Sequence, residues 1–112
     1  MDNDKFNELQ LYEINMAIKH GLSEKKIELF KNPCLDDSQM EQIRWGLEKG
    51  YPIEKIKIYA DEKYTVEQMR ILLLCIEKNF TDKEIEHIKA TFVYKSDAYD
   101  VFEQILSSKL RT

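Results

Sequence analysis

The sequence predicts an all-α protein, and three observations support that prediction. Gly and Pro are scarce, with three and two residues in 112, which leaves little room for turn-rich β structure. Apolar residues recur at helical spacing within segments such as MEQIRWGL, residues 40–47. The whole pattern then recurs along the chain at a constant interval without a gap, as it does in stacked helical repeats. We therefore predict a short right-handed helical-hairpin solenoid of three 29-residue repeats plus a C-terminal capping helix.

The 29-residue register places residues of similar type at the same position in successive copies. Along the long helix of each copy the aligned sets are Gln10, Gln39 and Gln68; Leu11, Met40 and Met69; Ile14, Ile43 and Leu72; and Ile18, Leu47 and Ile76. The same register relates Phe6, Leu35, Tyr64 and Val93, and a further step puts Ala98, Val101 and Ile105 in the positions of Met69, Leu72 and Ile76. A two-helix unit cannot bury its apolar stripe alone, so each copy should be covered by the next.

From this register we expect seven helices in a single domain that spans residues 1–112. The repeats cover about 6–34, 35–63 and 64–92, and a half-repeat cap covers 93–112. The expected helices are 5–20, 24–31, 37–49, 53–60, 66–78, 82–90 and 96–109.

The start and end of each helix have their own signals. Asp36 and Thr65 are helix-start residues, each with a Gln three positions later, and TDKE at 81–84 fits a capping box. Each long helix should end at a residue type that tolerates the left-handed conformation, namely Gly21, Gly50 or Asn79. The short helices should then begin at Ser23, Pro52 and Thr81. A small residue, Ala17, Gly46 or Cys75, lies between the apolar positions of each long helix, where it would let a neighbouring helix approach closely.

Composition excludes several classes of protein. The net charge of −4 and the interleaving of Lys and Arg with acids argue against a nucleic-acid binder, including a helix-turn-helix reader. The two cysteines form no spaced pair, which favours free thiols in a reducing compartment. The acidic, polar N-terminus is no signal peptide, and the longest apolar run, ILLLCI, is too short to span a membrane. We expect a cytoplasmic protein.

No pattern of catalytic or metal-ligating residues is found. His20, His87, Cys34 and Cys75 lack the paired spacing of a zinc site, and the acidic clusters lack the ligand spacing of a calcium loop. There is no nucleophile elbow, Cys-His pair or Gly-rich phosphate loop. The carboxylates are interpreted as helix-surface residues that pair with Lys or Arg. The sequence therefore predicts a protein that is not an enzyme and that has no cofactor and no metal.

The candidate partner-binding residues are mostly aromatic. Arg44, Trp45, Lys49 and Tyr51 form the first group, because Trp, Tyr and Arg are the side chains that dominate binding energy at interfaces. Large apolar residues at helical spacing are more often core, so we favour a core position for Trp45, and the alternative is that Trp45 lines the ridge that binds a partner. Arg44 and Lys49 are placed on the surface.

A second group of candidates lies near the C-terminus. The segment from residue 90 carries Tyr94 and Tyr99, which the closing helix would leave on the surface. They would form a second contact site or the seam of a homodimer, and plain capping of the last repeat is the simpler interpretation.

The second copy, QMEQIRWGLEKGYPIEKIKIYADEKYTVEQM, carries a resemblance to known proteins. Its pattern Q-M-x-x-I-R-x-G-L-E-x-G resembles degenerate tandem helical repeats in proteins of plasmids, conjugative elements and prophages of low-GC Gram-positive bacteria. The resemblance covers about residues 10–88 and implies a scaffold without catalytic residues. We expect a protein that binds another protein through its repeat surface. The alternative is an inhibitor from a phage or mobile element that blocks a host defence nuclease, in the manner of an anti-CRISPR protein, by protein binding or nucleic-acid mimicry.

Overall fold

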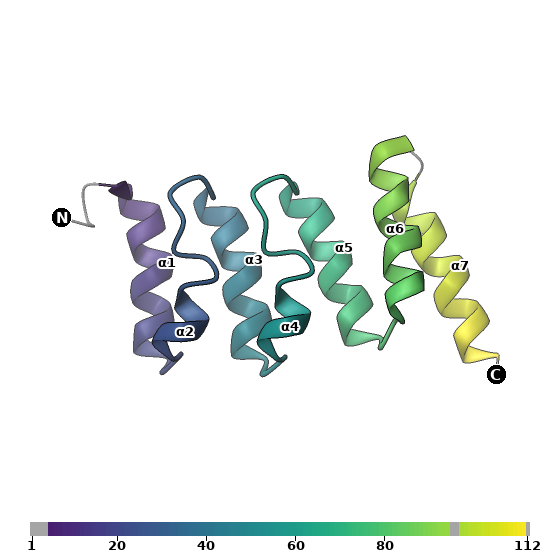
Figure 1. The fold of residues 1–112 in the computed structure, drawn as a ribbon, viewed down its shortest axis with the longest axis horizontal. Helices are drawn as coiled ribbons and strands as arrows, with labels where there is room; N and C mark the ends of the chain where they lie inside the picture. Colours follow the sequence, from purple (N-terminus) through teal and green to yellow (C-terminus); the bar gives the residue numbers. More distant parts are fainter. Residues whose placement is uncertain (1–4, 95–96, 112) are drawn as a thin grey trace. The chain divides into compact units, whose positions relative to one another are not determined.

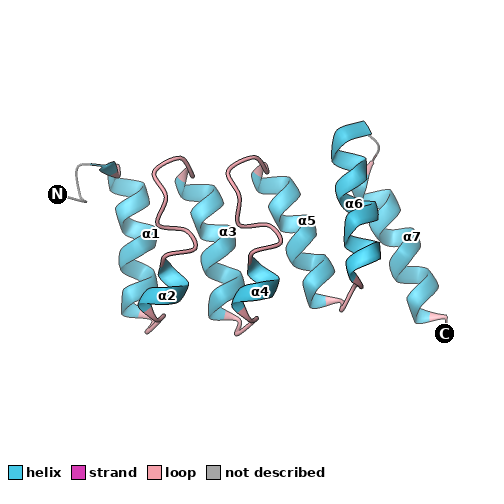
Figure 2. Ribbon diagram, viewed as in Figure 1, coloured by secondary structure: helices cyan, strands magenta, loops and turns pink. Residues whose placement is uncertain are grey.

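A computed structural model describes residues 5–94 and 97–111, with the side chain of Tyr94 left out. The described residues form seven helices and no strand, which confirms the all-α prediction. The helices are α1 (Glu8–Lys19), α2 (Glu24–Ile27), α3 (Asp37–Glu48), α4 (Ile53–Ile56), α5 (Val66–Glu77), α6 (Asp82–Tyr94) and α7 (Ala98–Leu110) (Figures 1 and 2).

The chain divides into two compact units, and the division falls inside α5, between Met69 and Arg70. Each unit is described by itself below. The single 1–112 domain and its repeat boundaries stay predictions.

The long helices of the first unit begin as their sequences predict. The side chain of Asp36 accepts the N–H of Gln39 at 2.8 Å, and the side chain of Gln39 accepts the N–H of Asp36 at 2.9 Å. Asn7 and Gln10 form the same reciprocal pair in the preceding copy, and Thr65 and Gln68 form it in the following copy. These capping boxes satisfy N–H groups that have no partner within the helix.

In the first two capping boxes, the Gln side chain also donates hydrogen bonds to the loop that precedes the next long helix. Gln10 Nε2 donates to the carbonyl oxygens of Pro33 and Leu35 at 3.2 and 2.7 Å. Gln39 Nε2 donates to those of Glu62 and Tyr64 at the same two distances. Both loops lack regular structure, so the amide supplies hydrogen bonds to carbonyl groups that have no place in a helix.

The long helices end in left-handed residues, as predicted. Gly21, Gly50 and Asn79 have φ values of +82°, +92° and +58°. After the first of them, the N–H of Leu22 donates to Ala17 O at 3.0 Å, and after the second the N–H of Tyr51 donates to Gly46 O at 3.4 Å. These bonds back to the last helical turn are those of a Schellman ending.

Substitution of Gly50 by Val should destabilise the protein by about 1–2 kcal/mol, because a β-branched residue resists a positive φ. A Cβ built on Gly50 would meet no atom within 4 Å, so the cost arises from the backbone and not from a clash. Asn79→Gly is the control, and it should be neutral or mildly stabilising. A thermal melt of Gly50→Val that matches the wild type would contradict this interpretation.

The core of the first unit lies between α1 and α3 and beneath the two short helices. α1 and α3 lie side by side, and α2 and α4 each follow the end of a long helix (Figure 1). The fully buried side chains of this core lie on the long helices, in α4 and in the segment after each short helix, and they include Ala17, Phe30, Met40, Ile43, Leu47, Ile56 and Tyr59. The Tyr59 hydroxyl donates to Gln42 O at 2.7 Å, which satisfies its buried oxygen.

The short helices of the first unit are shorter than predicted. α2 and α4 have four residues each and are followed by turns, where a longer helix was expected. The chain then turns at Asn32 and Asp61, whose side chains accept the N–H groups of Cys34 and Lys63 at 2.9 and 3.0 Å. Such local bonds compete with helix formation.

In the second unit the corresponding segment stays helical. Ala90 stands where the first two copies have Asn32 and Asp61, and Ala is the best helix former. α6 therefore continues through thirteen residues. Val93, predicted to be equivalent to the buried Leu35 and Tyr64, is 76% exposed. The register is wrong at this position because the loop that buries its equivalents is absent.

The apolar stripe predicted for α7 is only half-buried. None of Ala98, Val101 and Ile105 is fully buried, and the buried residue is Phe102. Its ring stacks on that of Phe80, with centroids 5.0 Å apart. Lys109, two turns further along α7, donates to Glu84 Oε1 at 2.8 Å.

Candidate protein-interaction surface

An exposed apolar surface lies on one side of α1 and α3. Leu9, Tyr12 and Met16 are spaced i, i+3 and i+7, so they share one face of α1. Trp45 of α3 occupies the position that Met16 has in α1, one copy later. Leu9, Tyr12 and Trp45 are 60%, 56% and 41% exposed, and Met16 is half-buried. We call these four residues the ridge surface.

Trp45 was predicted to be core and Arg44 to be surface, and both predictions are wrong. Trp45 is exposed, whereas Arg44 is only 6% exposed. Successive residues of a helix point about 100° apart, so one can face α1 while the next faces solvent. The arginine faces α1 because a carboxylate is there to receive it.

That carboxylate belongs to Glu13, which the sequence placed on the helix surface and which is buried. Arg44 Nε donates to Glu13 Oε2 at 3.3 Å, and Nη2 donates to Oε1 and Oε2 at 3.3 and 3.1 Å. Arg44 Nη1 donates to Glu48 Oε2 at 2.9 Å, and the same oxygen lies 2.9 Å from His20 Nδ1. The four side chains join α1 to α3 directly beside Trp45.

Burial and ion pairing shift the pKa values of these groups in opposite directions. Burial raises the pKa of Glu13, and the charge and hydrogen bonds of Arg44 offset this only in part. Burial would lower the pKa of Arg44, but Glu48 and Glu13 outweigh it and raise that pKa. Burial would also raise the pKa of Glu48, but the hydrogen bonds from Arg44 and His20 outweigh burial and lower that pKa. The network therefore holds a charged guanidinium under the ridge surface.

The other predicted binding residues are dispersed. Lys49 is exposed at the end of α3, and Tyr51 is half-buried after the turn. Tyr99 is exposed in the first turn of α7, in the second unit. The side chain of Tyr94 lies outside the described residues. The structure therefore brings only Arg44, Trp45 and Lys49 together on one helix.

Sequence reasoning missed Leu9 and Tyr12. A usable signal was present, because the same two positions of the next copy are Ser38 and Glu41. Because Ser38 and Glu41 are polar, these two positions are not required for packing between copies. The apolar side chains of Leu9 and Tyr12 at the same positions then indicate contact with a partner molecule.

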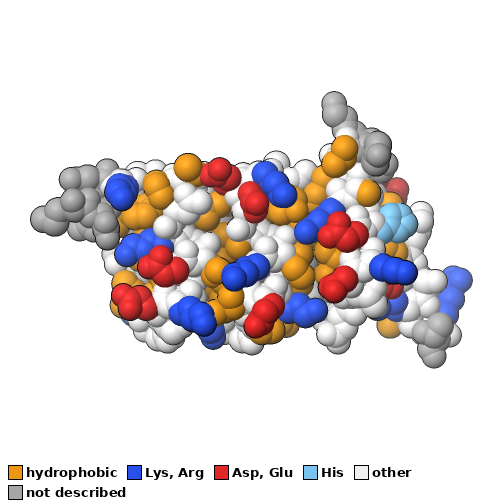
Figure 3. Space-filling model, in the orientation of Figure 1, with side chains coloured by type: hydrophobic (Ala, Val, Ile, Leu, Met, Phe, Trp, Pro, Cys, Tyr) orange, Lys and Arg blue, Asp and Glu red, His pale blue; other side chains and the backbone are white. Residues whose placement is uncertain are grey.

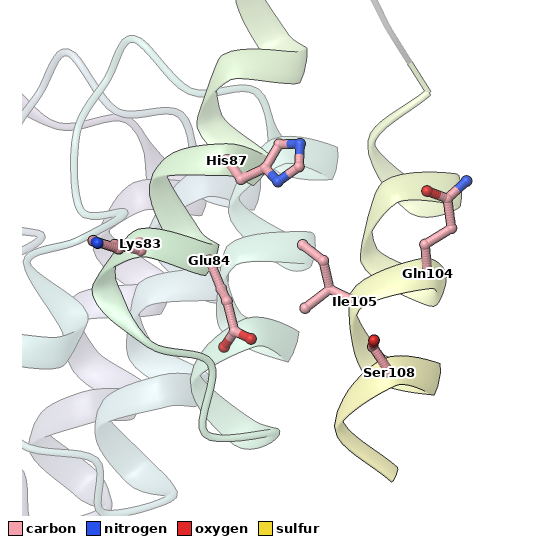
Figure 4. A pocket seen from close by; sticks show the side chains of 6 residues that line it. All are labelled: Lys83, Glu84, His87, Gln104, Ile105 and Ser108. Atoms are coloured by element: carbon pink, nitrogen blue, oxygen red, sulfur yellow. The ribbon is translucent and has the colours of Figure 1, made fainter. Parts of the chain in front are cut away.

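A groove of the second unit lies between α6 and α7. It has a volume of about 380 Å³ and is lined by Lys83, Glu84, His87, Gln104, Ile105 and Ser108 (Figure 4). Glu84 is engaged by Lys109, whose hydrogen bond lowers the pKa of that carboxyl. Among the described residues no three His, Cys, Asp or Glu side chains converge as metal ligands. The described residues of the groove therefore offer no cluster of metal ligands.

The charges of the first unit are mixed on the face that Figure 3 shows. Lys and Arg side chains alternate with Asp and Glu over this part of the chain, without a region of one sign. No described helix has the length and apolar character needed to cross a membrane. The mixture provides no continuous basic track for phosphate groups.

The two cysteines differ in environment. Cys75 is buried, which raises its pKa to about 12, whereas Cys34 is exposed. The pKa of Cys34 is raised by a hydrogen bond and the negative charge of Glu62.

Glu62→Gln should therefore increase the thiolate fraction of Cys34 and accelerate its alkylation near pH 8. Glu54→Gln, an exposed change elsewhere in the first unit, is the matched control. Alkylation of Cys34 at the wild-type rate in Glu62→Gln would show that this carboxylate does not act on the thiol.

Comparison with protein-family models, with curated proteins and with solved structures finds no match in any of the three. The function must therefore be argued from the geometry of the chain.

Proposed function

We propose that this chain is a non-enzymatic, cytoplasmic interaction protein that binds another protein through the ridge surface. The observation that carries the proposal is the exposure of Leu9, Tyr12 and Trp45 together on α1 and α3. Large exposed side chains of this kind supply binding energy once a partner removes them from water. A protein of this kind needs neither a cofactor nor a metal.

The scaffold for this surface is a short right-handed solenoid of three helical hairpins closed by α7. Support comes from the recurrence of the same local bonds at 29-residue spacing in the first unit, including the two Gln amides and the capping boxes. In such an architecture consecutive long helices present equivalent positions side by side, which produces an extended surface without a pocket. The resemblance to tandem repeats of mobile-element and prophage proteins is consistent with this role.

The buried network gives the ridge surface a fixed support. Arg44 is held from both sides by Glu13 and Glu48, so the backbone next to Trp45 is fixed relative to α1. A surface with little freedom to lose on binding retains more of its contact energy as affinity.

The test is recovery of a partner from the native host with tagged full-length chain. The double variant Tyr12→Ser with Trp45→Ser should lose the partner, at a cost of about 2 kcal/mol or more of binding. Leu110→Ser is the matched control, because it also removes an exposed apolar side chain, from α7. Thermal melts of both variants should stay close to the wild type.

The outcomes separate the alternatives. Trp45 is the only tryptophan, so a blue shift of its emission on adding purified partner reports burial of the ridge surface. A partner that is a defence nuclease would favour the inhibitor function over a general interaction role. Retention of the partner by the double variant, or equal loss in Leu110→Ser, would refute the ridge surface as the binding site.

A further inference from the structure

A second face of α1, distinct from the ridge surface, is apolar and uncovered. It consists of Leu11, Asn15 and Ile18, spaced i, i+4 and i+7, with Glu8 and Lys19 at its two ends. Ile18 is 60% exposed, Leu11 is half-buried and Asn15 is exposed. We call this the outer face of α1. Leu11 and Ile18 thus form a second apolar strip on α1 besides the ridge surface, as expected of a helix that is covered on more than one side.

The next copy shows that this face is normally covered. Its equivalents in α3 are Met40, Arg44 and Leu47, all of which are buried. In the first unit α1 packs on α3, and Glu13 of α1 reaches Arg44 on that face. α1 itself has no described helix of the first unit on its outer side. Leu11, Asn15 and Ile18 therefore occupy positions that a neighbouring helix covers in α3, but no described helix of the first unit covers them in α1.

We propose that the outer face of α1 binds the same face of a second copy of this chain, with the two α1 helices antiparallel about a two-fold axis. Charge selects this orientation. Glu8 lies in the first turn and Lys19 in the last, roughly 16 Å apart along the axis. Antiparallel pairing brings Glu8 towards Lys19 of the partner subunit, twice by symmetry, whereas parallel pairing would place like charges together.

The remaining residues fit the same arrangement. Leu11 packs against Ile18 of the partner subunit, so both apolar side chains leave water. Asn15 lies near the axis, where its carboxamide meets that of Asn15 of the partner subunit and the two can exchange N–H···O bonds. A single polar residue at such a position also selects one register over others.

The helix pair is short, so the dimer is expected to be concentration-dependent. α1 has twelve residues, and an interface of this length lies at the lower end of the sizes seen for stable association. Exchange between monomer and dimer should be fast, and added salt should weaken the pairing, because the Glu8–Lys19 pairs lie at its rim.

Sedimentation equilibrium of the full chain over micromolar to millimolar concentrations tests the proposal. The wild type should show a monomer–dimer equilibrium. Glu8→Lys and Lys19→Glu should each weaken it about tenfold, and the double exchange should restore it. Ile18→Glu should raise the dissociation constant at least about 100-fold, because it places an unpaired carboxylate in the interface. Thermal melts check that each variant is folded.

A cysteine at the axis provides a second measurement. Asn15→Cys in a Cys34→Ser background should form an intermolecular disulfide on mild oxidation, since Asn15 lies opposite its own copy. Lys57→Cys in the same background, exposed at the end of α4, is the matched control and should cross-link far more slowly.

Three results would overturn the proposal. The first is a chain that stays monomeric at millimolar concentration. The second is a dimer that Ile18→Glu and the charge exchanges leave unchanged, because another surface would then form it. The third is a monomer that dimerises only after removal of residues 1–4, because the chain's own N-terminus would then be the occupant of the outer face. None of these results depends on the ridge surface, so the proposed function is tested separately.

Discussion

Replacement of Arg44 by Met is expected to destabilise the first unit by about 3–5 kcal/mol, because it leaves the buried carboxylate of Glu13 without its partner. Both side chains are nearly inaccessible, at 7% and 5% exposure, so water cannot substitute for the lost hydrogen bonds. The double variant Glu13→Met with Arg44→Met removes both charges and should recover most of that loss. Urea titrations of the three proteins measure the difference. A loss of less than about 1 kcal/mol in Arg44→Met would show that the pair is not buried in solution.

The same variant should have a distinct pH dependence. Without Arg44, burial and the charges of Glu41 and Asp37 act on Glu13 without compensation, so the pKa of its carboxyl, already raised in the wild type, rises further above the unfolded value of about 4.3. Such a group contributes stability that is fully present below the unfolded pKa and is lost as pH rises through the folded pKa. The deficit of Arg44→Met relative to wild type should therefore be smallest in acid and grow towards neutral pH.

In the wild type, Glu48 contributes in the opposite sense over the acid range. The pKa of Glu48 is lowered, so its contribution is present above the unfolded pKa and is lost as pH falls through the folded pKa. Stability curves of the two proteins against pH should therefore converge in acid. Parallel curves would show that Glu13 is not the group responsible.

Truncation of Ile43 to Ala should cost about 2–5 kcal/mol, since the side chain is fully buried between elements that cannot close the cavity. This is a large part of the roughly 5–15 kcal/mol by which a small domain is stable. Leu72→Ala, at the same position of the third copy, should behave alike. Leu9→Ala is the matched control on an exposed site and should cost less than about 0.5 kcal/mol. An Ile43→Ala loss below about 1 kcal/mol in a denaturant titration would show that the stripe is misassigned.

The helices and their ends could be predicted because their signals are local. A capping box or a left-handed helix ending involves residues a few positions apart, so it is visible in the sequence. The 29-residue register then placed the buried stripe of α3 and α5 correctly. In α1 only Ile14 of the predicted stripe is buried, because Leu11 and Ile18 have no preceding copy to cover them. The register also failed at Val93, where one changed residue, Ala90, lets a helix replace a loop.

The Glu13–Arg44 pair could not be predicted by similarity between copies, because the two residues are 31 positions apart and neither type recurs at its position. The register still held a signal. Ile71 and Leu73 of the third copy occupy the positions of Glu13 and Arg44 in their own copies, and both are buried. Apolar residues at these positions show that the site is interior, whichever side chain fills it elsewhere. Trp45 was misplaced for the related reason that a large apolar side chain was assumed to need burial.

The Gln amides of the first unit restrict which residues can replace them. At Gln10 and Gln39 the side-chain oxygen accepts from the cap backbone, while the nitrogen donates to two loop carbonyls. Glu has nearly the same shape but cannot donate when ionised, and Asn is one methylene too short to reach both partners. Neighbouring core positions accept Ile in one copy and Leu in the next, because they require only volume. Substitution at Gln10 and Gln39 is therefore limited by the number and direction of their hydrogen bonds, whereas at those neighbouring core positions it is limited by size.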